Sequence, residues 1–300
     1  MRFAHFSDLH LLSLAGARVL DFASKRWIGA ANLLANRGRR YHAEVFEALV
    51  ADLAGRNLDH VICTGDITNL ALEQEFVFAR ERFDRIALGS SGVTVIPGNH
   101  DAYVSKGADF FAGYFSDYHE PDADWAWDTG EPWPMVRVRG DLAVIGLSTS
   151  RTTPWFTAYG SVGPEQLERL AAVLRDPRLA TRFRVVALHH CPVGGHAKSR
   201  IRGLRDHRAL ARVVASAGAE LVLHGHEHED LAATLPAPGG EVAVRGIQAG
   251  SYDGGKPRLR ARYRIYELVA ASSRPTLAAE ELRVWDPKSR TFVEDGVAPV

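Results

Sequence analysis

Several classes of protein are excluded by what this sequence lacks. It contains only two cysteines, Cys63 and Cys191, among 300 residues, which is too few for a disulfide framework or a cysteine-rich zinc site. Lysine plus arginine equals aspartate plus glutamate at 36 each, so no overall charge selects polyanions such as nucleic acids. No apolar run approaches the ~20 residues of a membrane span, and nothing resembles a signal peptide. We therefore expect a cytoplasmic protein without a nucleic-acid partner, with both cysteines packed inside.

Histidine is abundant instead, and it gathers in short polar blocks. Six of the 13 histidines fall within five blocks, each of which follows a short, mostly apolar run. In chain order the blocks are Asp8-Leu9-His10, Gly65-Asp66-Ile67-Thr68-Asn69, Gly98-Asn99-His100-Asp101, His189-His190 and Gly225-His226-Glu227-His228. Together they offer about seven oxygen and nitrogen ligands, enough for two metal ions ~3.5–4 Å apart when one carboxylate bridges them.

Two of these blocks place metal-binding side chains two residues apart. Asp8 and His10 share this spacing, and so do His226 and His228. On an extended strand end, residues two apart point to the same face. The members of each pair are therefore expected to reach one metal centre.

The order and spelling of the blocks resemble the calcineurin-like metallophosphoesterase superfamily, whose pattern is D-x-H, G-D-x-x-N, G-N-H-D/E, H, G-H-x-H. The match spans more than two thirds of the chain. The resemblance implies an α/β fold, a four-layer α-β-β-α sandwich of two packed mixed sheets with flanking helices. It also implies hydrolysis of a phosphodiester or pyrophosphate bond by a hydroxide that bridges two divalent ions. Asn69 stands where purple acid phosphatases carry tyrosine, which leaves Mn, Fe, Co, Zn or Mg as the metal.

The resemblance also assigns ligands to the two ions. It implies that metal one takes Asp8, His10, Asp66 and His228, and that metal two takes Asp66, Asn99, His189 and His226. Asp66 would be the bridge, because a carboxylate has two oxygens. His189 is preferred to His190, being the first of the pair in related sequences. His5 and His224 precede the motifs within expected strands and are interpreted as core or supporting residues.

His100 has a different predicted role. The family uses this histidine outside the coordination sphere, beside the scissile phosphate, where it stabilises charge or protonates the leaving oxygen. Asp101 would hold the His100 ring in place. The alternative is a merely structural histidine on a metal-binding loop.

Hydrophobic periodicity predicts alternating strands and helices in one domain, residues 1–300, with a C-terminal β extension from about 260. Strands are expected over 3–6, 58–64, 93–96, 135–138, 142–147, 184–188, 220–223, 242–248, 262–268 and 282–285. Helices are expected over 42–56, 73–88, 164–175 and 208–217. The last three strands are expected to be antiparallel.

Three loops carry the information on substrate. Residues 18–42 form a basic amphipathic insert, which is either an ordinary helix on the core or a cap that contacts a lipid substrate or an anionic membrane. Lys198, Arg200, Arg202 and Arg205 follow the His189 block and either face solvent or grip a second phosphate or an acidic group. Residues 103–133 contain nine aromatic side chains, some for the core and some for a pocket wall.

The expected substrate is a small anionic phosphoester, and nucleotide-linked and lipid-linked phosphoesters are among the candidates. The motifs look most like cyclic-nucleotide and glycerophosphodiester phosphodiesterases, and they are shared by the UDP-2,3-diacylglucosamine pyrophosphohydrolases of lipid A synthesis. A nuclease of the superfamily would carry a capping domain and a basic groove, and a metal-free scaffold would lack several ligands. The sequence indicates no oligomeric state.

Overall fold

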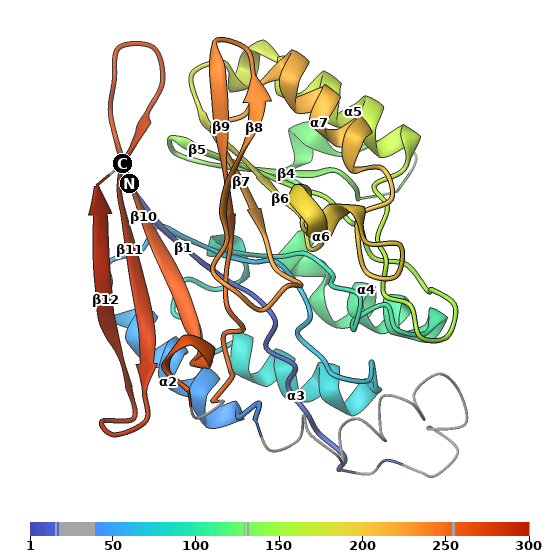
Figure 1. Ribbon diagram of the computed structural model, residues 1–300, viewed down its shortest axis with the longest axis vertical. Helices are drawn as coiled ribbons and strands as arrows, with labels where there is room; N and C mark the ends of the chain where they lie inside the picture. The colour runs from blue at the N-terminus through green and yellow to red at the C-terminus, as the bar shows by residue number, and fades with distance from the viewer. Residues whose placement is uncertain (16, 18–39, 129, 131, 254–255, 300) are drawn as a thin grey trace.

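The computed structural model describes residues 1–15, 17, 40–128, 130, 132–253 and 256–299. Two six-stranded sheets lie against one another in the described chain, with helices on their outer faces (Figure 1). The layered α/β architecture implied by the resemblance is therefore confirmed. Most of the predicted insert at 18–42 lies outside the described residues.

The first sheet joins the two ends of the chain. Its strand order is β12-β11-β10-β1-β2-β3. The strands are β1 (Arg2–Phe6), β2 (His60–Cys63), β3 (Val93–Val95), β10 (Arg262–Val269), β11 (Thr276–Asp286) and β12 (Thr291–Pro299). β1, β2 and β3 run parallel, while β10 pairs antiparallel with β1. The strands after residue 260 therefore continue the sheet that carries the first three polar blocks.

The second sheet has the order β4-β5-β6-β7-β9-β8. Its strands are β4 (Met135–Arg139), β5 (Leu142–Gly146), β6 (Phe183–Ala187), β7 (Leu221–His224), β8 (Ala232–Ala237) and β9 (Gly240–Gly246). The strand expected over 242–248 was predicted to be antiparallel. That prediction is wrong for its pairing with β7, because β9 runs parallel to β7. β8 explains this direction: it pairs antiparallel with β9, and the turn between them contains Gly239 at φ 83°. The chain thus reverses once before it returns beside β7.

Six α-helices lie in the described chain, and four short 3₁₀ turns accompany them. The helices are α2 (Ala43–Ala54), α3 (Glu73–Phe83), α4 (Ser105–His119), α5 (Pro164–Arg175), α6 (Gly194–Lys198) and α7 (His207–Ala217). The 3₁₀ turns are η3 (Ser90–Gly92), η4 (Ala123–Trp125), η5 (Pro177–Leu179) and η6 (Pro257–Leu259). None of the helices among the described residues is long and apolar enough to cross a bilayer.

Two helices differ from the sequence expectation. The helix expected over 73–88 ends at Phe83, where the Ile86 N–H donates to the Phe83 carbonyl and a turn buries Ile86. α4 was not predicted, because its residues were read only as an aromatic-rich segment. Its buried face includes Phe111, Phe115 and Tyr118 at helical spacing. These aromatics therefore serve the core.

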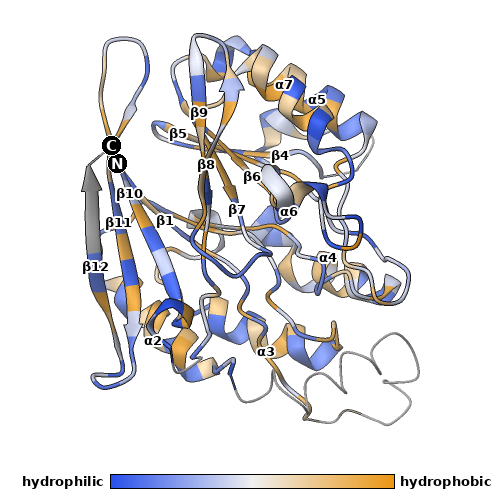
Figure 2. Cartoon of the chain, viewed as in Figure 1, coloured by the Kyte–Doolittle hydropathy of each residue, from blue (hydrophilic) through white to orange (hydrophobic). Residues whose placement is uncertain are grey.

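Apolar side chains fill three layers. Phe3, Ile62, Val144 and Leu223 belong to the cluster between the sheets, and Figure 2 shows the inner strands of the second sheet mostly in hydrophobic colours. A second cluster packs α2, α3 and α4 on the first sheet, and a third packs α5 and α7 on the other. Each large apolar side chain buried in this way stabilises the fold by roughly 1.5–3 kcal/mol.

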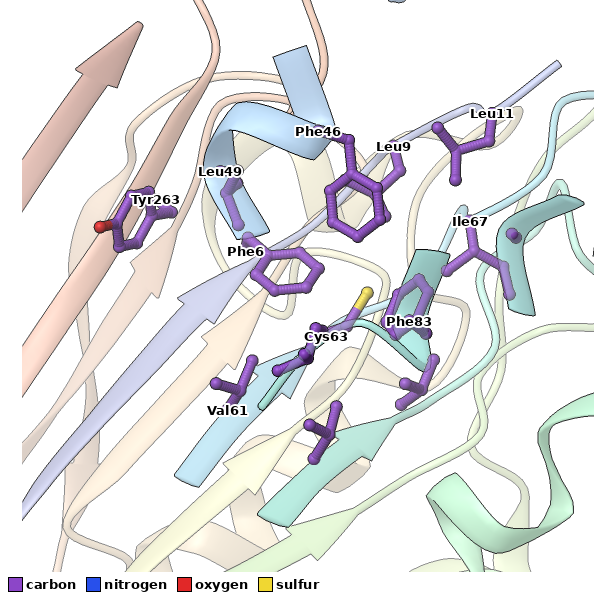
Figure 3. Packing of buried hydrophobic residues seen from close by; sticks show 14 of the residues in the cluster. Phe6, Leu9, Leu11, Phe46, Leu49, Val61, Cys63, Ile67, Phe83 and Tyr263 are labelled. Carbon is purple, nitrogen blue, oxygen red and sulfur yellow. The ribbon is translucent and has the colours of Figure 1, made fainter. Parts of the chain in front are cut away.

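Aromatic rings form the centre of the cluster under α2 and α3. The ring centroids of Phe6 and Phe46 lie 5.7 Å apart, and those of Phe46 and Phe83 lie 5.3 Å apart. Figure 3 shows these rings facing one another, with Cys63 beside them. Both cysteines are buried, as expected, and neither forms a disulfide. This rigid base supports the turns that follow β1 and β2.

Candidate metal centre

The predicted ligands meet where parallel strands of both sheets end. β1 leads to Asp8 and His10, β2 to Asp66, β3 to Asn99, β6 to His189, and β7 to His226 and His228. In α/β folds, ligands bind beyond the carboxyl ends of the strands. The ligand atoms of Asp8, His10, Asp66 and His228 lie within 4.8 Å of one another, and so do those of Asp66, His189 and His226. The structure thus brings the predicted residues into two clusters that share one carboxylate.

The backbone is strained at these positions. Nine non-glycine residues of the described chain have positive φ, and five of them carry predicted ligands. They are Asp8 at 56°, His10 at 45°, Asp66 at 53°, His226 at 73° and His228 at 54°. A left-handed conformation costs roughly 1–2 kcal/mol per residue outside glycine. Such strain concentrates at functional sites, where the surrounding structure must hold it.

The strain also corrects one geometric expectation. Residues two apart were expected to point to the same face because they lie on an extended strand end. Asp8 and His10 instead lie in left-handed turns after β1 has ended at Phe6. Their side chains still reach one cluster, but by means of the turn and not the pleat.

Glycines let the backbone approach the two carboxylates. A Cβ added to Gly98 would lie 2.1 Å from Asp66 Oδ1, and one added to Gly225 would lie 2.5 Å from Asp8 Oδ2. Real Cβ atoms do not approach other heavy atoms so closely. These two glycines are therefore required by the packing around the site, which explains their place in the blocks.

The first cluster has the dimensions of a coordination shell. His228 Nε2 lies 3.1 Å from Asp8 Oδ1 and 3.1 Å from His10 Nε2. His10 Nε2 lies 3.8 Å from Asp66 Oδ2. Two ligands that are each about 2.1 Å from one ion lie about 3.0–3.4 Å apart in octahedral or tetrahedral geometry. The donor set therefore fits a divalent cation.

The second cluster has similar dimensions around His189. Its Nε2 lies 3.4 Å from Asp66 Oδ2, 3.2 Å from Asn99 Oδ1 and 3.3 Å from His226 Nδ1. Asp66 Oδ2 thus faces imidazoles of both clusters. This position suits a carboxylate that bridges two ions, as the sequence suggested, and Asn99 supplies the neutral oxygen.

The far nitrogen of three imidazoles is fixed by an oxygen of the protein. The contacts join His189 Nδ1 to the Thr64 carbonyl at 2.7 Å, His226 Nε2 to the Arg202 carbonyl at 3.0 Å, and His228 Nδ1 to the Tyr41 hydroxyl at 2.8 Å. Such partners set the tautomer and orientation of metal-binding histidines. Tyr41 was missed by the sequence reasoning because it belongs to no motif.

The carboxylates give the centre a negative field. Burial alone would raise the pKa of Asp66, but the nearby histidines, His189 first, hold it well below its usual range. Burial would lower the pKa of His189, but the carboxylates of Asp66 and Asp8 raise it to about 9. A divalent cation would satisfy the same field and displace the His189 proton.

His100 lies beside the clusters and outside both. Its backbone N–H donates to Asp66 Oδ1 at 2.7 Å, and its ring packs edge-to-face on His10 with centroids 4.7 Å apart. Ring Nδ1 lies 2.6 Å from the Asn69 carbonyl. The main chain therefore orients the ring beside the two clusters.

The expectation that Asp101 holds this ring is wrong. Its carboxylate accepts hydrogen bonds from the backbone N–H groups of Gly98 and Thr68, each at 2.9 Å, and from Thr68 Oγ1 at 3.0 Å. Asp101 follows Gly98 by three residues, so its side chain folds back onto the turn that it closes. Asp101 thus ties the second and third blocks together.

His190 is engaged elsewhere. Its Nδ1 lies 2.8 Å from Thr149 Oγ1, and its Nε2 lies 3.0 Å from the Ala158 carbonyl. Burial lowers its pKa to about 3, so the ring is neutral. With both nitrogens occupied, His190 cannot ligate, and the geometry favours His189. His5 is also buried, with Nε2 2.9 Å from Thr64 Oγ1, in keeping with a supporting role.

Known proteins resemble this chain in both sequence pattern and fold. The family model for calcineurin-like phosphoesterases matches residues 1–230. The fold is similar to that of a dimetal phosphatase from Danio rerio, with TM-score 0.65 and 14% identity, over 100% of this chain and 98% of the other. It is also similar to a purple acid phosphatase from yellow lupin, Lupinus luteus, with TM-score 0.62 and 11% identity, over 98% of this chain and 52% of the other. No curated protein matches significantly.

Proposed function

Because this chain belongs to the calcineurin-like phosphoesterase family, we propose that it hydrolyses a phosphodiester or a pyrophosphate at the paired clusters. The observation that carries the proposal is the placement of Asp66 between two sets of imidazoles, with His100 immediately beside them. Two divalent ions held there would lower the pKa of water and offset charge on the phosphoryl group.

The chain's own residues have separable tasks. Asp8, His10 and His228 would hold one ion, Asn99, His189 and His226 the other, and Asp66 both. His100 would donate a proton from Nε2 to the leaving oxygen, because Asn69 already occupies its Nδ1. His228 is the most open of the ligands in the two clusters, with 23% of its side chain exposed, against 2% or less for Asp8, His10, Asp66 and His189. Substrate would therefore approach from the side of His228.

The preference for diesters and pyrophosphates rests on the motif set. Asn69 occupies the position where purple acid phosphatases carry a metal-binding tyrosine, so the charge-transfer chemistry of that branch is not expected. Mn, Fe, Co, Zn and Mg are proposed as metals, since the ligands are oxygen and imidazole nitrogen. A metal-free scaffold is disfavoured, because all seven predicted ligands are present and converge.

A substrate panel tests the proposal. Protein loaded with Mn²⁺ should hydrolyse bis(p-nitrophenyl) phosphate faster than p-nitrophenyl phosphate. The panel should then include cyclic nucleotides, glycerophosphodiesters and UDP-linked sugars, so that the released monophosphate identifies the class. A clear preference for monoesters over every diester and pyrophosphate would overturn the proposal.

A further inference from the structure

Two neighbouring loops expose large apolar side chains among positive charges. The structure describes seven exposed large hydrophobic residues, and three lie here: Trp155 at 57%, Phe156 at 76% and Ile201 at 55%. Residues 151–159 and 198–205 also expose five cations, namely Arg151, Lys198, Arg200, Arg202 and Arg205. Neither segment contains an acidic residue. We call these two segments the rim.

The two segments form one surface. The Ala158 N–H donates to the Ile201 carbonyl at 2.8 Å, and the Arg205 N–H donates to the Gly160 carbonyl at 2.9 Å. The Arg205 guanidinium lies 4.1 Å from the centroid of the Tyr159 ring. In Figure 1 the yellow-green and gold loops lie together beside α6. Apolar and basic groups therefore share one face.

The rim is fastened to the metal centre. The Arg202 carbonyl accepts from His226 Nε2 at 3.0 Å, and the Arg202 guanidinium donates to the His226 carbonyl at 3.2 Å. The Ala158 carbonyl accepts from His190, the neighbour of His189. A large surface bound to the rim would thus lie close to the second cluster of ligands.

Phe156 is held outward by its own turn. Its φ of 63° lies in the left-handed region, which residues that carry a Cβ atom avoid. The turn is closed by the Thr157 N–H on the Pro154 carbonyl at 3.2 Å and by Thr153 Oγ1 on the Thr157 carbonyl at 2.6 Å. A strained turn that presents an aromatic ring to water gains nothing from core packing. This exposed position suits an apolar side chain that inserts into an apolar layer outside the protein.

We propose that the rim docks on an anionic lipid bilayer. Charge complementarity supports this occupant, because the chain as a whole is neutral while the rim carries five cations and no acid. The first acid after the rim, Asp206, is already bonded to the backbone N–H groups of Val162 and Gly163. Aromatic and aliphatic side chains flanked by cations are typical of residues at the boundary between headgroups and acyl chains.

The proposal goes beyond phosphoester hydrolysis and does not depend on it. Docking would hold the metal centre close to the membrane surface, where phosphoesters carried by lipids are concentrated. It also differs from the predicted role of residues 18–42, because it rests on another part of the chain.

Vesicle co-sedimentation of the full chain tests the docking. The probes are vesicles of phosphatidylcholine alone and of phosphatidylcholine with one third phosphatidylserine. We expect binding to the anionic vesicles that weakens as salt is raised. Trp155→Ser with Phe156→Ser should weaken binding at least about tenfold. Lys198→Ala with Arg200→Ala should do the same, since each cation near an anionic surface strengthens binding about fivefold.

Matched controls separate this effect from a general loss of charge or apolar surface. Val269→Ser removes an exposed apolar side chain elsewhere, and Arg208→Ala with Arg212→Ala removes two exposed cations of α7. Both controls should bind vesicles as the unchanged protein does. All variants should keep the melting temperature, because the altered side chains are exposed.

Three outcomes would overturn the proposal. The first is no binding to anionic vesicles. The second is binding that survives both rim variants. The third is a rim that joins two copies of this chain, seen as a dimer by light scattering that the rim variants dissociate while vesicle binding is unchanged.

Discussion

Two of the largely buried charge clusters in the described part of the chain differ in what neutralises them. On the strands β9, β10 and β11, Glu280 accepts hydrogen bonds from Arg245 at 3.0 Å and Arg264 at 2.9 Å. The other cluster lies at the strand ends that carry the predicted ligands, which we call the ligand edge. There the carboxylates of Asp8 and Asp66 face imidazoles and backbone N–H groups. No arginine or lysine of the described residues is bonded to either carboxylate.

The difference separates a structural cluster from a binding cluster. Guanidinium groups hold fixed positive charge at every pH that the protein meets, so the Glu280 cluster is complete with its own residues. Imidazoles lose their proton when they bind a metal ion, so the carboxylates at the ligand edge are suited to divalent cations and not to fixed positive groups of the protein. Five strained residues at that edge support the same conclusion.

The largest effect is expected from Asp66→Ala. Each ion would lose its shared charged ligand, so neither would be held well enough to work. We expect kcat/KM to fall by roughly three or more orders of magnitude, at least ~4 kcal/mol of transition-state stabilisation. Activity on a generic aryl phosphodiester and metal content by mass spectrometry are the measurements. Near-normal hydrolysis with intact metal content would refute the bridge.

His100→Asn tests whether the two ligand clusters are sufficient for turnover without the histidine beside them. Both ions should stay bound, while turnover falls by ~10²–10⁴-fold because the leaving oxygen is no longer protonated. The loss should be smaller for p-nitrophenyl than for alkyl leaving groups, since nitrophenolate leaves without a proton. Equal losses for both would argue against a general acid, and loss of metal would make His100 a ligand.

Glu280→Ala tests the structural cluster, whose loss should affect stability and not metal binding. Arg245 and Arg264 would be left partly buried without their carboxylate, which should cost roughly 2–3 kcal/mol of unfolding free energy after allowance for their partial exposure. Denaturant unfolding measures this loss. Metal content should be unchanged, and Glu294→Ala, an exposed acid on β12, serves as the control. A loss of metal with normal stability would show that the two clusters are not independent.

Much of the site was predictable, because each ligand lies in a short block of characteristic residue types and glycines. Gly98 and Gly225 lie in the motifs because no Cβ fits beside Asp66 and Asp8. What the sequence could not reveal are contacts made by residues outside these blocks. The hydroxyl of Tyr41 contacts His228, which lies 187 positions away. No sequence pattern around Tyr41 predicts this contact.

The errors have similar causes. The role expected for Asp101 came from the resemblance, while its side chain is engaged by the backbone of its own turn. The direction of β9 depends on the β8–β9 hairpin, and β8 has a mostly exposed pattern that hydrophobic periodicity does not detect. Strand positions in the core were predictable because their apolar runs are buried on both faces.

The smallest expected effect comes from Tyr41→Phe, which removes the oxygen that fixes His228. Loss of such a partner typically weakens metal binding about 10- to 100-fold, and we expect the lower end because the other ligands of that cluster remain. Competition with a metal-sensitive chelator measures the affinity. Tyr252→Phe is the control, since its hydroxyl meets Arg40 and not a ligand. Equal affinities for all three proteins would remove Tyr41 from the site.

The central claim, that the ligand edge is completed by cations, is tested most directly by counting metal ions and removing them. Protein purified without chelator and dialysed against metal-free buffer should retain about two divalent ions per chain. Stripping them with EDTA should lower the melting temperature, because binding to the folded state alone stabilises it, and re-addition should restore it. A stoichiometry well below one, with a melting temperature that neither EDTA nor Mn²⁺ changes, would contradict the account.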